Sequence, residues 1–155
     1  MRAIVVLLFS MVFGTSTAWA ETNITINEPW IRDAAPGVSA LAGYMEIENH
    51  GDTNIALVSA SGSDFDSIML HETITHSGVA AMVHRDQVEI PSQTKVTFKP
   101  GDLHLMLMRP KKTLAVGDKS TIDLIFSDGG KINTEFEVKK AVMKEGQAKH
   151  APNNH

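Results

Sequence analysis

Short segments in which hydrophobic and polar residues alternate, or in which β-branched residues recur, follow one another along most of this chain. A period of two residues predicts β-strands that are buried on one face. No stretch shows a sustained apolar period of 3.6 residues, so the sequence does not predict an amphipathic helix. Eight strands are predicted, at residues 41–49, 55–60, 67–72, 80–85, 95–98, 103–108, 120–126 and 131–138.

Turn residues separate these segments, at 49–52, 100–101, 116–118 and 128–130. Many short strands joined by such turns favour an all-β fold, an antiparallel β-sandwich. The chain has no internal repeat or long linker, so we expect one domain over residues 21–139. Five aromatic residues are expected in its core, namely Trp30, Tyr44, Phe98, Phe126 and Phe136.

Segment 103–108 has the most regular alternation, because every second residue is leucine. In a strand the three leucines would face the core, and His104, Met106 and Met108 would project from the other face. His104 and Met106 would then be neighbours, roughly 6–7 Å apart along the strand.

A second pair of His and Met residues flanks the polar segment 75–78. A hairpin centred on His76 and Ser77 would place His71 opposite Met82, within cross-strand contact. If this hairpin packs beside segment 103–108, two imidazoles and two thioethers converge.

Thioether sulfur is a soft, neutral ligand that binds Cu(I) well and Zn²⁺, Mg²⁺ or Ca²⁺ poorly. We therefore predict that His71, Met82, His104 and Met106 form a Cu(I) site. The alternative for each residue alone is ordinary: methionine often fills gaps in a core, and a lone histidine often lies at the surface. A metal-free sandwich thus stays open at this point.

Cysteine is absent from the sequence, which excludes disulfides, thiolate zinc sites and a blue-copper centre in this chain. Ser, His and Asp are present without a G-x-S-x-G elbow, a Gly-rich phosphate loop or an H-E-x-x-H helix. We therefore expect a carrier and not an enzyme. An oxidase or a dismutase is the weakest alternative, because a site that strongly prefers Cu(I) is poorly suited to redox cycling.

Residues 1–20 have the pattern of a cleaved signal peptide: a basic start at Arg2, a short apolar core and an A-x-A site at residues 18–20. The apolar run is too short to span a bilayer, so we expect a soluble periplasmic protein. Loss of Arg2 from the 14 basic residues leaves 13 against 18 acidic ones, a net charge of −5. Nucleic acid is therefore not expected as a partner.

The C-terminal segment, residues 140–155, is polar and lacks strand patterning, but it contains Met143, His150 and His155. One interpretation is a disordered tail whose histidines are incidental. The other is a mobile arm that binds Cu(II) as a secondary site.

The spacing His71-x10-Met82-x21-His104-x-Met106 resembles the H-x10-M-x21-H-x-M signature of the periplasmic PCu(A)C copper-chaperone family. Residues 70–73, 78–79, 88–91 and 99–107 also resemble that family. The resemblance implies a cupredoxin-like Greek-key β-sandwich, with the four motif residues as Cu(I) ligands. It further implies delivery of copper to the CuA centre of cytochrome c oxidase, alone or alongside a Sco-type protein.

Two nearby residues are candidate secondary ligands: His84, on the same strand face as Met82, and Met108, two residues beyond Met106. We expect a monomer. Periplasmic copper buffering for resistance, and a metal-free adhesion or assembly module, are the alternative functions.

Overall fold

The computed structural model describes residues 23–140, which form ten strands and no helix. The predicted all-β class is therefore confirmed. No helix long and apolar enough to cross a membrane occurs within residues 23–140. The strands are β1 (Ile24–Arg32), β2 (Ala40–Asn49), β3 (Ile55–Ser61), β4 (Phe65–His76), β5 (Val79–Arg85), β6 (Val88–Ile90), β7 (Thr94–Phe98), β8 (Leu103–Pro110), β9 (Lys119–Phe126) and β10 (Lys131–Lys139).

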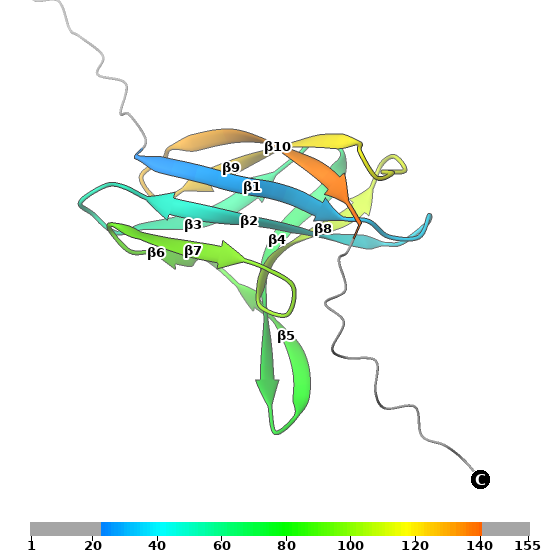
Figure 1. Cartoon of the computed structure of the whole chain (residues 1–155), viewed down its shortest axis with the longest axis horizontal. Coiled ribbons are helices and arrows are strands. Elements are labelled where there is room, and N and C mark those ends of the chain that lie inside the picture. The colour runs from blue at the N-terminus through cyan, green and yellow to red at the C-terminus, as the bar shows by residue number, and fades with distance from the viewer. Residues whose placement is uncertain (1–22, 141–155) are drawn as a thin grey trace, which may run out of the picture.

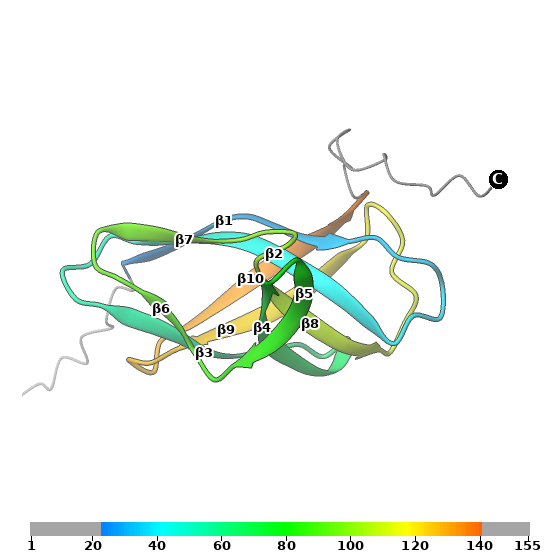
Figure 2. The same ribbon diagram turned by 90° about the horizontal axis from the view of Figure 1, so that it is seen from below.

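Seven of these strands form a flattened barrel, in the order β4-β8-β2-β1-β10-β9-β3 (Figures 1 and 2). The barrel closes where β3 meets β4, with Ala60 opposite Ile68. β1 and β10 pair in parallel, whereas the other strand pairs of the described residues are antiparallel. Closure removes most free sheet edges, which leaves the added strands β5, β6 and β7 on β4, β3 and β2.

Two strands were not predicted, β1 and β6. β1 escapes the period-two criterion because Pro29 lies within it and its pairing with β2 shifts register between Asn27 and Trp30. β6 has only three residues, too few for a pattern. The β4–β5 hairpin is longer than predicted and projects from the barrel (Figure 1).

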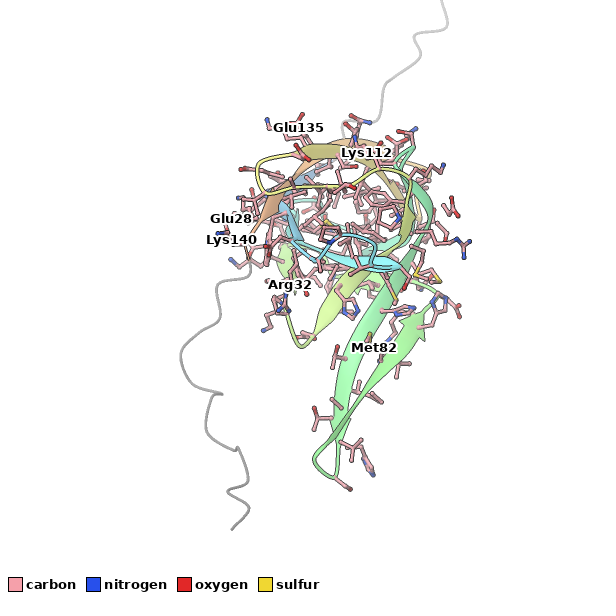
Figure 3. The ribbon with its side chains drawn as sticks, turned by 90° about the vertical axis from the view of Figure 1, so that its right-hand side faces the viewer. Glu28, Arg32, Met82, Lys112, Glu135 and Lys140 are labelled. Carbon is pink, nitrogen blue, oxygen red and sulfur yellow. The ribbon has the colours of Figure 1, made fainter. Side chains whose placement is uncertain are left out.

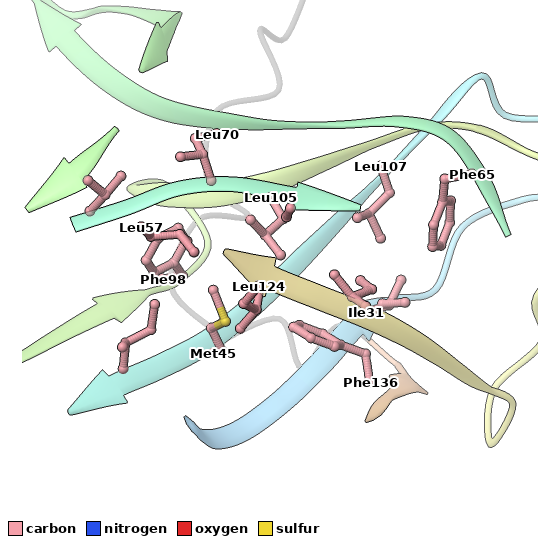
Figure 4. Close-up of a cluster of buried hydrophobic side chains, with 14 of the residues drawn as sticks. Ile31, Met45, Leu57, Phe65, Leu70, Phe98, Leu105, Leu107, Leu124 and Phe136 are labelled. Atoms are coloured by element: carbon pink, nitrogen blue, oxygen red, sulfur yellow. The ribbon is translucent and has the colours of Figure 1, made fainter. Parts of the chain in front are cut away.

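The core fills the inside of the barrel (Figure 4). Leu105 and Leu107 are completely buried there, and Leu103 packs against the same cluster, so the predicted inward face of β8 is confirmed. Full burial of one leucine contributes about 1.5–3 kcal/mol to folding, so the alternation of β8 is strongly fixed.

Three of the five aromatic residues expected in the core are there, namely Phe98, Phe126 and Phe136. Tyr44 is also buried, with 5% of its surface exposed, although it lies outside the main cluster, whereas Trp30 is only partly buried. Trp30 and Tyr44 pack against each other outside the core cluster, with ring centroids 4.7 Å apart. They are directly opposite on β1 and β2, next to the inward-facing Ile31 and Met45, so strand alternation turns them outward.

Candidate metal site

The outward face of β4, β5 and β8 gathers the histidines and methionines of the sequence motif. His71 of β4 lies directly opposite His104 of β8 on one side and His84 of β5 on the other. The ring centroid of His71 is 5.9 Å from that of His104 and 5.6 Å from that of His84, in edge-to-face geometry. Three imidazoles therefore stand in one row across three strands.

Met106 lies next to this row, one step along the outward face of β8. Its neighbours Leu105 and Leu107 are fully buried inward, whereas Met106 is partly exposed. His71, His104 and Met106 are thus brought together as predicted, by direct pairing and by the i, i+2 spacing of a strand. Met108 follows on the same face, one further step from the histidines.

The predicted register of the β4–β5 hairpin was wrong by two residues. His71 lies opposite His84, and Met82 lies opposite Thr73. The turn residues are Ser77 and Gly78, with φ of 50° and 80°. A two-residue turn with positive φ at both positions has the type I′ geometry, which glycine adopts without strain. The turn therefore lies one residue later than expected.

A shift of two residues keeps side chains on the same face, so Met82 still shares the face of His71. It is, however, on a diagonal and not directly opposite. Met82 is 64% exposed on the projecting hairpin (Figure 3). The motif thus combines a partly buried group at the barrel with one exposed thioether on the hairpin.

His104 is buried, and its ring is fixed by a backbone acceptor. Its Nδ1 lies 2.9 Å from the carbonyl oxygen of Asp102. A carbonyl only accepts hydrogen bonds, so Nδ1 carries the proton and donates it. The other nitrogen, Nε2, is then the one with a free lone pair for a metal.

The Asp102 carbonyl is set by a tight turn and also accepts a hydrogen bond from the backbone N–H of Thr73, at 3.2 Å. The Asp102 N–H donates to the carbonyl of Lys99 across Pro100 and Gly101, and Gly101 has a φ of 82°. Proline followed by a residue of positive φ is typical of a type II turn. This turn was predicted, and it links β4 to the His104 ring.

His71 is partly buried, and its Nδ1 is a buried atom without a hydrogen-bond partner. Burial lowers the pKa of His71, and the imidazoles of His104 and His84 lower it further. The ring is therefore neutral near pH 7. An unpartnered buried nitrogen on a neutral ring is suited to donating its lone pair to a cation.

His84 differs from the other two histidines in exposure. Its side chain is 55% exposed, and its Nε2 lies 3.5 Å from a carboxylate oxygen of the fully exposed Asp86. Within residues 23–140 no group of three or more His, Asp or Glu side chains is arranged to hold a metal ion. Methionine sulfur lies beside the imidazoles on this face, and a site that combines the two donors favours a soft ion.

Met69 was not among the predicted site residues, yet it shares their face. It lies on β4 directly opposite Met106 and shares the outward face of His71. The signal was available in the sequence, because Met69 precedes His71 by two residues and Leu70 between them is buried. The predicted tail residues Met143, His150 and His155 lie outside the described residues.

Residues 24–138 match the model of a protein family described as putative lipoprotein LpqE-like. A putative lipoprotein of Leifsonia xyli subsp. xyli is 32% identical over 108 residues, covering 69% of this chain and 64% of the relative. An uncharacterized protein of Rickettsia prowazekii is 34% identical over 113 residues, covering 70% and 62%. The chain therefore matches slightly less than two thirds of the length of these curated relatives.

Solved structures of similar fold include the copper-bound PCuAC domain from PmoF2, with a TM-score of 0.67 and 25% identity. That match covers 79% of this chain and 97% of the domain. The solution structure of Cu(I)-DR1885 from Deinococcus radiodurans has a TM-score of 0.61 and 32% identity, covering 82% and 83%. Both names refer to a copper-bound protein.

Proposed function

The chain belongs to the LpqE-like family, and we propose that it is a copper chaperone that carries one Cu(I) on the outward face of β4, β5 and β8. Its solved neighbours are PCuAC domains, so the resemblance found in the sequence is confirmed, together with the cupredoxin-like fold. Copper-bound forms among these neighbours support copper as the cargo.

The observation that carries the proposal is the direct pairing of His71 with His104 beside Met106. His104 has Nδ1 engaged by a carbonyl and Nε2 free, whereas His71 has a buried nitrogen without a partner. Two imidazoles and one neighbouring thioether, which bind a metal ion as uncharged donors, would supply three of the ligands. Met82, from the hairpin, would supply the fourth donor.

The exposure of Met82 suggests how copper leaves. Four neutral ligands leave the bound ion with a total charge of +1, so no thiol needs to be protonated for release. An acceptor protein can replace the exposed thioether first and the buried ligands afterwards, by one-for-one ligand exchange. The projecting hairpin makes that first step sterically accessible.

We further propose that the protein acts after export, with residues 1–20 as a cleaved signal. The name of the Leifsonia relative, a putative lipoprotein, supports a location outside the cytoplasm. The proposed recipient is the CuA centre of cytochrome c oxidase, reached directly or with a Sco-type protein. Buffering of excess copper at the same site is the alternative.

Anaerobic transfer tests delivery. Protein loaded with Cu(I) is mixed with a metal-free CuA domain, and the copper content of each is measured after separation. Transfer that exceeds the rate of copper release to buffer supports delivery. In a deletion strain, loss of oxidase activity only under low copper supports the same function, whereas sensitivity only under high copper supports buffering.

A further inference from the structure

Met69 occupies a position on the proposed copper face that the family motif leaves out. It lies directly opposite Met106, as His71 lies directly opposite His104. Directly opposed residues of antiparallel strands have Cβ atoms about 4.5–5.5 Å apart, and residues i and i+2 share a face. Met69, His71, His104 and Met106 are therefore the corners of one compact square on two adjacent strands.

Met69 is not a core residue. It is partly exposed and is absent from the hydrophobic core cluster, whereas Met45 of β2 belongs to that cluster and is 2% exposed. Met69 and Met106 are thus both partly exposed residues of the outward face. A thioether held there can turn toward the two imidazoles without leaving the barrel surface.

Met82 has a less direct relationship to Met106. The two residues are two strands apart, and the position opposite Met82 is Thr73, four residues along β4 from the partner of Met106. On a flat sheet that separation is roughly 16 Å between backbones. Both sulfurs can bind one ion only if the hairpin curls over the face.

We infer that Met69 is a further Cu(I) ligand, which alternates with Met82 as the second thioether of the site. The inference rests on the proposed function. His71, His104 and Met106 are common to both donor sets. With Met69 the ion lies on the barrel and the hairpin is free; with Met82 the hairpin holds the ion at an exposed position.

This arrangement lets copper stay bound while the hairpin engages an acceptor. When Met82 dissociates from the copper ion, Met69 binds in its place. The number of ligands therefore stays the same, and no proton is transferred. Cu(I) imposes no strong geometric demand comparable to that of Cu(II), and its affinity for thioether sulfur is similar whichever methionine supplies it.

Methyl NMR gives the first test. Protein labelled with ¹³C at the methionine methyl groups is titrated anaerobically with Cu(I), and signals are assigned by single Met→Leu substitutions. We expect the methyl signals of Met69 and Met106 to shift during the titration and to stop shifting at one equivalent of copper. The methyl signal of Met45 should not shift. If Met82 and Met106 shift and Met69 stays with Met45, Met69 is not a ligand and the proposed function stands. If no methionine shifts and no copper binds, the proposed function itself fails.

X-ray absorption at the copper edge separates ligation from mere proximity. Copper-loaded Met82→Leu should keep two sulfur neighbours, because Met69 replaces the lost donor, and Met69→Leu/Met82→Leu should keep one. The double variant should lose at least about tenfold more affinity than the product of the two single effects. Loss of one sulfur in Met82→Leu alone would overturn the inference. Met45→Leu is the matched control, since it removes a thioether that lies in the hydrophobic core and has no place in the site.

Discussion

The carbonyl oxygen of Asp102 lies 2.9 Å from Nδ1 of His104 and fixes which nitrogen of that ring can bind a metal. The same oxygen accepts the backbone N–H of Thr73, so one turn residue joins β4 to the imidazole on β8. A partner of this kind is typical of metal-binding histidines, and its loss commonly lowers metal affinity by about 10–100-fold.

The turn that positions this carbonyl should also affect copper binding. Gly101→Ala places a side chain at a φ of 82° and should disturb the type II turn. We expect about 1 kcal/mol lower stability and a Cu(I) affinity lowered by about tenfold. Chelator competition measures the affinity, and urea unfolding measures the stability.

Gly117→Ala is the control for that substitution. Gly117 has a φ of 93° and, like Gly101, no atom within 4 Å of the place where a Cβ would lie, but it belongs to the β8–β9 connection. It should lose similar stability and keep its copper affinity. Equal loss of affinity in both variants would show that the Gly101 effect is general destabilisation.

Neighbouring residues of β8 should separate folding from metal binding. Leu105→Ala removes a completely buried side chain and should cost about 2–5 kcal/mol of unfolding free energy. Met106→Leu, on the outward face, should cost less than about 1.5 kcal/mol. Urea unfolding of the metal-free proteins makes the comparison. Equal costs would mean that the assigned alternation of β8 is incorrect.

Cu(I) affinity should fall as the pH falls, because a protonated imidazole has no lone pair for the metal. Burial lowers the pKa of His71, and so do the imidazoles of His104 and His84. Protons therefore compete at His71 only below the ordinary histidine value of about 6.5. Protonation of His71 should therefore lower the Cu(I) affinity only at the acidic end of the pH range. In His71→Gln this part of the pH dependence should be absent.

Cu(I) affinity is measured by chelator competition at a series of pH values between 7.5 and 4.5. At each pH the affinity of the chelator alone is calibrated. An affinity that stays constant down to about pH 4 would count against histidine as a ligand.

Cu(II) gives a separate prediction for the secondary residues. If the C-terminal segment is a secondary Cu(II) site, its histidines supply ligands that Cu(I) binding at the barrel face does not use. Deletion of residues 141–155, which removes Met143, His150 and His155, should then weaken Cu(II) binding and spare Cu(I) binding. Calorimetry with each ion checks this. Unchanged Cu(II) binding would discard the tail as a secondary site, and His84→Gln would then test the remaining candidate.

Strand alternation predicted the face of each site residue correctly. It could do so because Leu105 and Leu107 have only one apolar environment available, the barrel interior. The exact register of the hairpin was not predictable in the same way. Placing the turn at Ser77–Gly78 or one residue earlier keeps every side chain on its face, so the hydrophobic pattern does not distinguish the two.

The remaining differences have similar local causes. β1 was not predicted because a proline and a bulge interrupt its pattern, and its place in the barrel depends on pairing with β2 and with the distant β10. The i, i+2 spacing places Met69 on the face of His71, but its direct pairing with Met106, which lies 37 positions later in the chain, exists only in the folded sheet. Cross-strand contacts of this kind are set by tertiary pairing.

An anaerobic titration of the protein with Cu(I) against a chromophoric chelator is the decisive test for a copper site on the outward face of β4, β5 and β8. His104→Gln and Met106→Leu are measured in parallel, with their folding verified by urea unfolding. We expect one tightly bound equivalent of Cu(I) in the parent protein and an affinity at least about tenfold weaker in each variant. No tightly bound equivalent, or an equivalent that both substitutions leave unchanged, would contradict a copper site on this face of the barrel.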